Sequence, residues 1–305
     1  MTSYLLRRLA ALVPVWLGVV LLAFLLIHSI PGGPFDTGTL RSPEATEFLR
    51  RHYHLDEPLW KQFGLYVTDV LHGNLGESMV RRGLYVQDVL GDRFPTSLTL
   101  GVAGLGVSLA VGLPAGLLGA VKQNRWPDHS VMVAATIGYA IPSFVLSLLL
   151  ILVFGGWLGW FPLGGWGTPS HVVLPAIALG LPWAGLIARL TRASMLEVLR
   201  QDYVRTAAAK GAPPRRIVVN HALRNALVPL TAVIAVLAAE LVTGSLIVEL
   251  IFGIPGIGRY MIDSVLGADY TMTLGLTVFY ATLIFVANFF ADVAYAFLDP
   301  KIRLG

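Results

Sequence analysis

The chain has 305 residues, of which 55% are hydrophobic and 13% are charged, and its mean hydropathy is +0.71. Since soluble domains carry about 25% charged residues, this composition excludes an ordinary soluble protein. The chain contains no cysteine, which excludes disulfides, thiol catalysis and cysteine metal sites. The net charge is +4, and the charged residues lie beside apolar runs. This placement indicates control of membrane topology rather than nucleic-acid binding.

Apolar runs of the length needed to cross a bilayer recur along the chain. About 20 residues of α-helix span the hydrocarbon core, whereas a β-barrel would show shorter segments of alternating polarity. We therefore predict an all-α integral membrane protein with six transmembrane helices. The spans are expected at residues 9–30, 96–121, 131–154, 172–190, 226–248 and 273–298.

The first apolar run is longer than the roughly 7–15 residues of a signal-peptide core, so we interpret it as a retained span. The polar residues that follow it predict an extracytoplasmic helical segment. The chain then divides into a first span at residues 1–30, this segment at 31–95, a five-span core at 96–298 and a cytoplasmic tail at 299–305.

Three helices are expected in the extracytoplasmic segment. Ser42-Pro43-Glu44 has the cap, proline and acid of a helix start. A second helix should follow Pro58, where apolar residues keep helical spacing. Apolar positions within residues 85–90 predict a third, interfacial helix. We favour a small helical cap over a separate domain.

The distribution of Lys and Arg orients the chain. Short cytoplasmic loops carry an excess of these residues. Placing both termini inside puts the most basic short loop, between the fourth and fifth spans, in the cytoplasm. Trp157, Trp160 and Trp166 then fall at the opposite interface, where aromatic side chains gather. We therefore expect cytoplasmic N- and C-termini.

Residues 197–229 form the most basic stretch of the core. Alanine-rich residues 202–210 predict a short helix that Gly211 should end. Two prolines then redirect the chain into a second basic helix at residues 215–225. Two short helices joined by a bend could dock into a groove of another protein, or the loop could serve membrane topology alone.

Catalytic and metal-binding patterns are missing from the sequence. A phosphate-binding P-loop needs Gly-Lys followed by Ser or Thr, and none of the four lysines follows a glycine. Neither HExxH nor GxSxG occurs, and the closely spaced His52 and His54 are interpreted as surface residues. The chain is thus expected to be non-catalytic and to hold no metal.

Ionisable and strongly polar groups within the predicted spans are few. Glu240 lies in the fifth span, and Asn288 and Asp292 lie one turn apart in the sixth. Such groups are costly to bury unless they face a partner or a wet cavity. We interpret them either as lining a translocation path or as interhelical polar contacts.

The basic stretch resembles the EAA loop of permease subunits in ABC importers. Ala207, Gly211 and Leu223 match the general pattern, while Arg205 and Thr206 stand where its Glu and Ala would be. These departures are similar to the B-type subunits of the dipeptide/oligopeptide/nickel permease family. Further segments resemble that subunit, namely 31–35, 53–58, 141–144, 202–207, 221–227, 252–258 and 298–301.

The resemblance implies the fold and partners of an importer. The fold would be that of a type I ABC importer permease. Its partners would be a second homologous permease subunit, two ATPase subunits or domains and an extracytoplasmic solute-binding protein. ATP and Mg would be bound by the ATPase, and this chain would need no cofactor. The residues coupled to the ATPase would be Asp202, Tyr203, Arg205, Thr206, Ala207, Lys210 and Gly211.

The resemblance also implies an ATP-driven importer in a bacterial or archaeal cell membrane. Oligopeptides are the favoured cargo and dipeptides the next, with nickel or another small solute as an alternative. An ATP-independent secondary carrier that uses Glu240 and Asp292, and an intramembrane enzyme, are alternatives from other classes.

Overall fold

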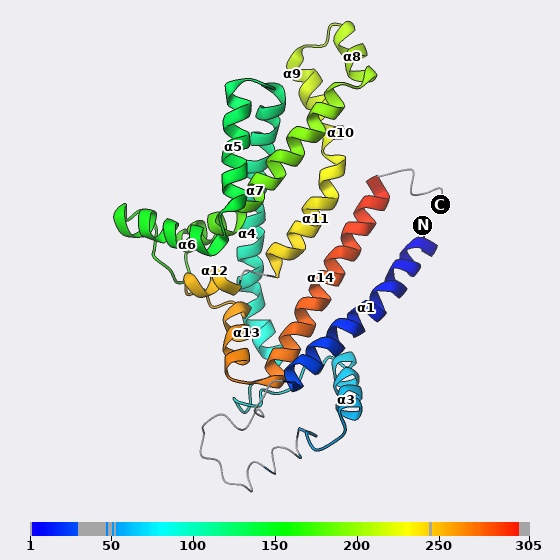
Figure 1. Ribbon diagram of the computed structural model, residues 1–305, viewed down its shortest axis with the longest axis vertical. Helices are drawn as coiled ribbons and strands as arrows, with labels where there is room; N and C mark the ends of the chain where they lie inside the picture. The colour runs from blue at the N-terminus through cyan, green and yellow to red at the C-terminus, as the bar shows by residue number, and fades with distance from the viewer. Residues whose placement is uncertain (1, 30–46, 48–50, 52, 244–245, 299–305) are drawn as a thin grey trace.

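The computed structural model describes residues 2–29, 47, 51, 53–243 and 246–298 (Figure 1). Within these residues the secondary structure is helical, apart from one isolated bridge between Glu77 and Tyr85. The longest helices run side by side along the long axis of the molecule. They are α1 (Thr2–His28), α4 (Val86–Val121), α7 (Pro169–Leu199), α11 (Val228–Val242) and α14 (Tyr270–Leu298).

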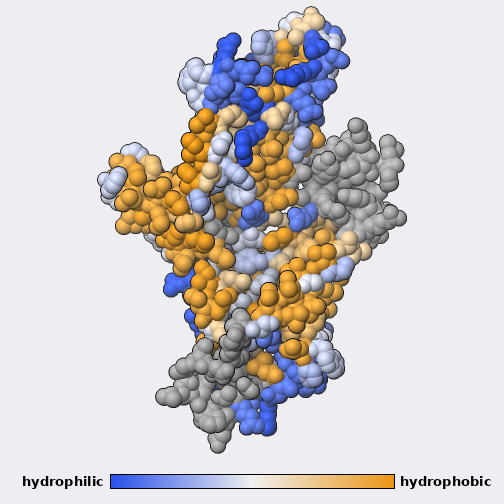
Figure 2. Space-filling model, viewed as in Figure 1, coloured by the Kyte–Doolittle hydropathy of each residue, from blue (hydrophilic) through white to orange (hydrophobic). Residues whose placement is uncertain are grey.

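Five stretches of the described residues are long and apolar enough to cross a membrane, and a bent pair of helices could form a sixth crossing. Figure 2 shows apolar side chains over the middle of the molecule and hydrophilic ones at both ends. The sequence-based expectation of an all-α membrane protein with six spans is confirmed. The division of the chain into 1–30, 31–95, 96–298 and 299–305 stays a prediction.

The third span is broken rather than continuous. The sequence predicts one helix at residues 131–154, but α5 (Trp126–Ala140) and α6 (Ser143–Leu150) are bent by 101°, and α6 continues as the π-helix η1 (Ile151–Trp157). Proline lacks a backbone N–H and disfavours the α conformation of the residue before it. Ile141 is accordingly extended, with ψ 120°, immediately before Pro142.

Two expectations for the extracytoplasmic segment can be compared with the structure. Helix α3 (Leu59–Leu71) begins after Pro58, as predicted. The interfacial helix expected at residues 85–90 does not exist separately, because these residues open α4, which runs without a break into the second span. The helix start at Ser42–Glu44 falls outside the described residues.

Small residues set the close packing of α4 against α7. A Cβ atom at Gly112 would lie 2.7 Å from the Ala184 carbonyl oxygen, and one at Gly116 would lie 2.6 Å from the Thr191 Cβ. The Ser108 hydroxyl donates to the Gly180 carbonyl oxygen at 2.8 Å. Backbones therefore touch where the sequence puts glycine, as expected for helices in lipid.

The remaining helices are short and lie at the two ends of the molecule. The end at the bottom of Figure 1 carries α3 and α13, and α12 lies above them. There the Asp269 carboxylate accepts hydrogen bonds from the Ser78 hydroxyl and from the backbone N–H of Met79, at 3.1 Å in the second case. This carboxylate ties the segment between α3 and α4 to the start of α14. The bounds are α8 Asp202–Ala209, α9 Pro214–Arg216, η2 Ile217–Leu223, α10 Arg224–Ala226, α12 Leu246–Ile251 and α13 Ile257–Leu266.

Candidate functional site

The basic stretch forms a projection at the top of Figure 1, beyond the long helices. Helix α7 ends at Leu199, α8 follows, and Gly211 turns the chain with a φ of +81°. Pro214 starts a second run of helical turns, α9, η2 and α10, that leads directly toward α11. The two predicted helices and the bend at Gly211 are confirmed. The second helix is longer than the expected 215–225, and its middle is a π-helix.

The second arm of the projection packs firmly onto the membrane helices. Met195, Ala222 and Ala226 are buried together with Ala120 at the end of α4. The Ser194 hydroxyl donates to the Ala226 carbonyl oxygen at 2.8 Å. This arm therefore packs directly against α4 and α7.

Helix α8 is held by much less. Val204 is its one buried residue, and the Asn225 side chain donates to the Tyr203 hydroxyl at 2.7 Å. The Tyr203 hydroxyl also lies 3.4 Å from the His221 carbonyl oxygen. With few contacts to this chain, most of the surface of α8 is open to another protein.

The residues predicted to contact an ATPase lie together on this open surface. Arg205 and Asp202 form an exposed ion pair at 3.7 Å, and Thr206, Lys210 and Gly211 are exposed beside them. Ala207 is half-buried. The structure thus brings the predicted residues onto one short helix and its C-terminal turn.

Gly211 has space around it but needs a special backbone. No atom lies within 4 Å of where a Cβ would be, so a side chain at this position meets no neighbour. Its φ of +81° lies in the left-handed region, which costs non-glycine residues about 1–2 kcal/mol. A larger residue here would project outward from the turn.

The intramembrane polar residues are not all brought together. Glu240 lies on α11 and lines a cavity of about 420 Å³ with the α5–α6 break and α7. Asn288 is half-buried on α14, and the Asp292 side chain falls outside the described residues. Whether these three residues line a path stays a prediction.

The family of the chain follows from its similarity to known proteins. Residues 112–304 match the family described as binding-protein-dependent transport system inner membrane component. The chain belongs to this family. It is therefore the membrane-embedded permease component of such a transport system, and it is a multi-pass membrane protein.

Relatives of known function cover the whole permease. The dipeptide transport system permease protein DppB of Bacillus subtilis is 40% identical over 100% of this chain and 99% of its own. The oligopeptide transport system permease protein OppB of Escherichia coli is 38% identical over 99% of this chain and 100% of its own. The glutathione transport system permease protein GsiC of Escherichia coli is also 38% identical, over 99% of each chain.

Solved structures give the fold of the permease. An inward-facing structure of the MetNI methionine ABC transporter has a TM-score of 0.59 and 21% identity, over 70% of this chain and 97% of that one. An amino acid ABC transporter crystallised with histidines gives a TM-score of 0.55 and 14% identity, over 68% and 94%. The ABC importer permease fold that the resemblance implied is confirmed.

An ion pair that sequence reasoning missed joins α5 to α7 near the projection. Arg192 of α7 donates from Nε and an Nη to the two carboxylate oxygens of Asp128 of α5, at 2.6 and 2.7 Å. The Asn124 N–H donates to the same carboxylate at 2.9 Å. Asp128 is 1% exposed. The partners are 64 residues apart, so no local pattern could have paired them.

A second missed residue, Glu249, supports the turn between α12 and α13. Its carboxylate accepts from the Gly258 N–H at 2.8 Å, and the Ile257 N–H donates to the Ser97 hydroxyl at 3.0 Å. A Cβ at Gly258 would lie 2.7 Å from this carboxylate. Residue 249 falls just beyond the predicted fifth span, so the sequence does not group it with the intramembrane acids, although the glycines that follow it indicate a close approach.

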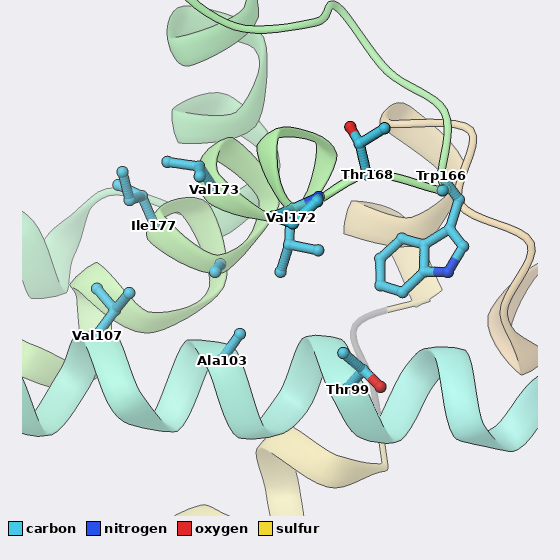
Figure 3. A pocket seen from close by; sticks show the side chains of 11 residues that line it. Thr99, Ala103, Val107, Trp166, Thr168, Val172, Val173 and Ile177 are labelled. Carbon is cyan, nitrogen blue, oxygen red and sulfur yellow. The ribbon is translucent and has the colours of Figure 1, made fainter.

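The permease also has an apolar cavity of about 710 Å³ between α4 and α7 (Figure 3). Thr99, Ala103 and Val107 come from α4, and Val172 comes from the first turns of α7. The Trp166 ring lies at one end of the cavity. The cavity offers mainly hydrocarbon and two threonine hydroxyls, and carries no charged side chain among the described residues.

Proposed function

We propose that this permease forms half of the translocation path of an ATP-driven importer of short peptides. The similarity to dipeptide, oligopeptide and glutathione permeases over the full chain supports a peptide cargo, since glutathione is itself a tripeptide. Oligopeptides are the first candidate and dipeptides the second. Nickel or another small solute is the alternative within the same family.

The chain would work without chemistry of its own. No P-loop sequence is present, so ATP and Mg would be bound by two ATPase subunits or domains. A second, homologous permease would complete the path, and a solute-binding protein would deliver the peptide from outside. The N- and C-termini and α8 would face the cytoplasm, as the distribution of basic residues favours.

The exposed, loosely held helix α8 is the single observation that carries the coupling role. We assign contact with the ATPase to Asp202, Tyr203, Arg205, Thr206, Ala207, Lys210 and Gly211 on this helix and its C-terminal turn. The second arm of the projection packs onto α4 and α7 through Met195 and Ala226. Movement of α8 would therefore reach the helices that line the path, and alternating access would follow from ATP binding and hydrolysis in the partner.

The absence of cysteine allows a direct test. Ala208→Cys places one thiol on the exposed face of α8, and Trp60→Cys places one on exposed α3 at the other end of the molecule. In the assembled importer, Ala208→Cys should cross-link to the ATPase subunit and Trp60→Cys should not. The same preparation in vesicles should take up peptide only with ATP and the binding protein. Uptake by this chain alone, without ATP, would instead favour a secondary carrier.

A further inference from the structure

A cavity of about 420 Å³ lies where the α5–α6 break, α7 and α11 meet. Its lining includes Tyr139, Pro142 and Ser143 from the break, Trp183 from α7 and Glu240 from α11. The three elements are membrane-spanning, so the cavity lies within the span rather than at an end of the molecule. Figure 2 shows some hydrophilic side chains near the middle of the molecule, between apolar regions.

Glu240 is a carboxylate without a balancing charge. It sits in the third-last position of α11, its side chain is exposed in the single chain, and among the described residues no cation or hydrogen-bond donor reaches its carboxylate. A charged group at membrane depth is costly unless it faces a wet cavity or a partner. Glu240 lines this cavity, so water or a cationic ligand there would meet the first of these conditions.

The helix break borders the same cavity, because Ile141, Pro142 and Ser143 line it. Pro142 has no N–H, so the Gly138 carbonyl lacks the donor that an unbroken helix would give it. Irregular backbone at membrane depth occurs where it is buried in protein or lines a wet cavity, and in transporters such carbonyls coordinate cations. An acidic side chain and a broken helix thus border the same cavity, and the carboxylate favours positive charge there.

The aromatic rings of the cavity indicate what kind of cation fits. Tyr139 and Trp183 meet edge to face, with centroids 6.3 Å apart. The Arg189 guanidinium already lies 4.8 Å from the Tyr139 ring centroid, so Trp183 is the ring left for a ligand cation. Rings and a carboxylate together suit an organic ammonium, and the described residues offer no group of three or more acidic or histidine ligands for a metal ion.

We propose that Glu240, with the α5–α6 break and Trp183, forms a site for the protonated amine of the transported solute. This inference rests on the proposed peptide cargo, because every unblocked peptide carries an ammonium at its N-terminus. The site lies in the membrane part of the path, separate from the partner that binds the solute outside. It makes the permease itself selective for cationic ends.

Reaction at a single thiol tests the charge preference of the cavity. Ser143→Cys introduces a single cysteine into the cavity lining of a chain that has none. Mass spectrometry of this chain then measures how much of the cysteine is labelled in the assembled importer. An ammonium-bearing thiosulfonate should react faster than a sulfonate-bearing one. Adding Glu240→Gln should lower this rate ratio by about tenfold, because a charged cleft concentrates its counter-ions to about that degree or more. Glu240→Asp should keep the ratio, and so should the exposed extracytoplasmic control Asp88→Asn.

Protection by peptides tests whether the solute's amine occupies the site. Tri-alanine should slow labelling of Ser143→Cys, and the same peptide with its terminal amine replaced by hydrogen should not. Glu240→Gln should abolish the difference. A rate ratio that Glu240→Gln leaves unchanged, or equal protection by both peptides, would overturn the inference while ATP-driven uptake kept the proposed function. If Glu240→Gln lowers the labelling-rate ratio but the importer takes up no peptide, a cation site would be supported and the peptide cargo would be overturned.

Discussion

Asp128 and Arg192 show how single residues fix the end of the permease that carries α8. Their paired hydrogen bonds join α5 to α7, one turn before the residues of α7 that pack against the second arm of the projection. The Asn124 N–H brings the α4–α5 turn into the same contact. Two helices and the turn between α4 and α5 therefore meet at one carboxylate beside the segment assigned to coupling.

Removing one member of this pair should destabilise the permease. Asp128→Asn leaves the Arg192 guanidinium without its carboxylate and should lower the free energy of unfolding by about 1–3 kcal/mol. Thermal unfolding in detergent measures the loss. The double variant Asp128→Leu/Arg192→Met should recover most of it, because two apolar groups can replace a buried pair at little cost. A double variant less stable than Asp128→Asn would contradict this account.

At the scale of the elements, α4 and α7 act as one unit because glycines let their backbones touch. The contact matters more than helix propensity at these positions. At Gly106 of α4 no atom lies within 4 Å of where a Cβ would be, whereas Gly116 of the same helix faces Thr191 and Ala188 of α7. The two glycines therefore separate packing from propensity within one helix.

Alanine at these two glycines should have opposite effects. Gly116→Ala forces α7 away and should lower stability by about 1–3 kcal/mol, as overpacking of a tight contact does. Gly106→Ala adds a methyl group in open space and should leave stability unchanged or raise it by up to about 1 kcal/mol. Unfolding temperatures of the two variants provide the comparison. Equal destabilisation by both would show that the α4–α7 contact is looser than described.

The elements also show what the sequence could and could not predict. Spans were predictable because apolar length alone identifies them, and the bend at Gly211 was predictable because glycine and proline punctuate it. The 101° break at Pro142 was not, since prolines such as Pro175 sit inside unbroken α7. Neighbouring helices decide which proline breaks a span. The Asp128–Arg192 pair was missed for a related reason, because its partners lie 64 residues apart in the chain. Glu249 was missed because it falls just beyond the predicted fifth span.

At the scale of the whole molecule, the proposed function assigns the long helices to the translocation path and α8 to contact with the ATPase. The projection formed by α8 to α10 lies at one end, and the tie between Asp269 and the extracytoplasmic segment lies at the other (Figure 1). Between them, α4 and α7 are packed too closely to slide independently. A push on α8 from an ATPase would thus be felt at the cavity lined by Glu240 and at the outer end.

The most direct test of this account replaces Gly211 by arginine in the reconstituted importer. No described atom lies within 4 Å of where a Cβ would be at this position, so Gly211→Arg should assemble, yet it should obstruct contact with the ATPase. Gly73→Arg is the matched control, because Gly73 has a φ of +82° and equally open surroundings near the end of α3, far from α8. The account predicts ATP-driven uptake lost in Gly211→Arg, with assembly intact, and kept in Gly73→Arg. Normal uptake by Gly211→Arg would contradict it.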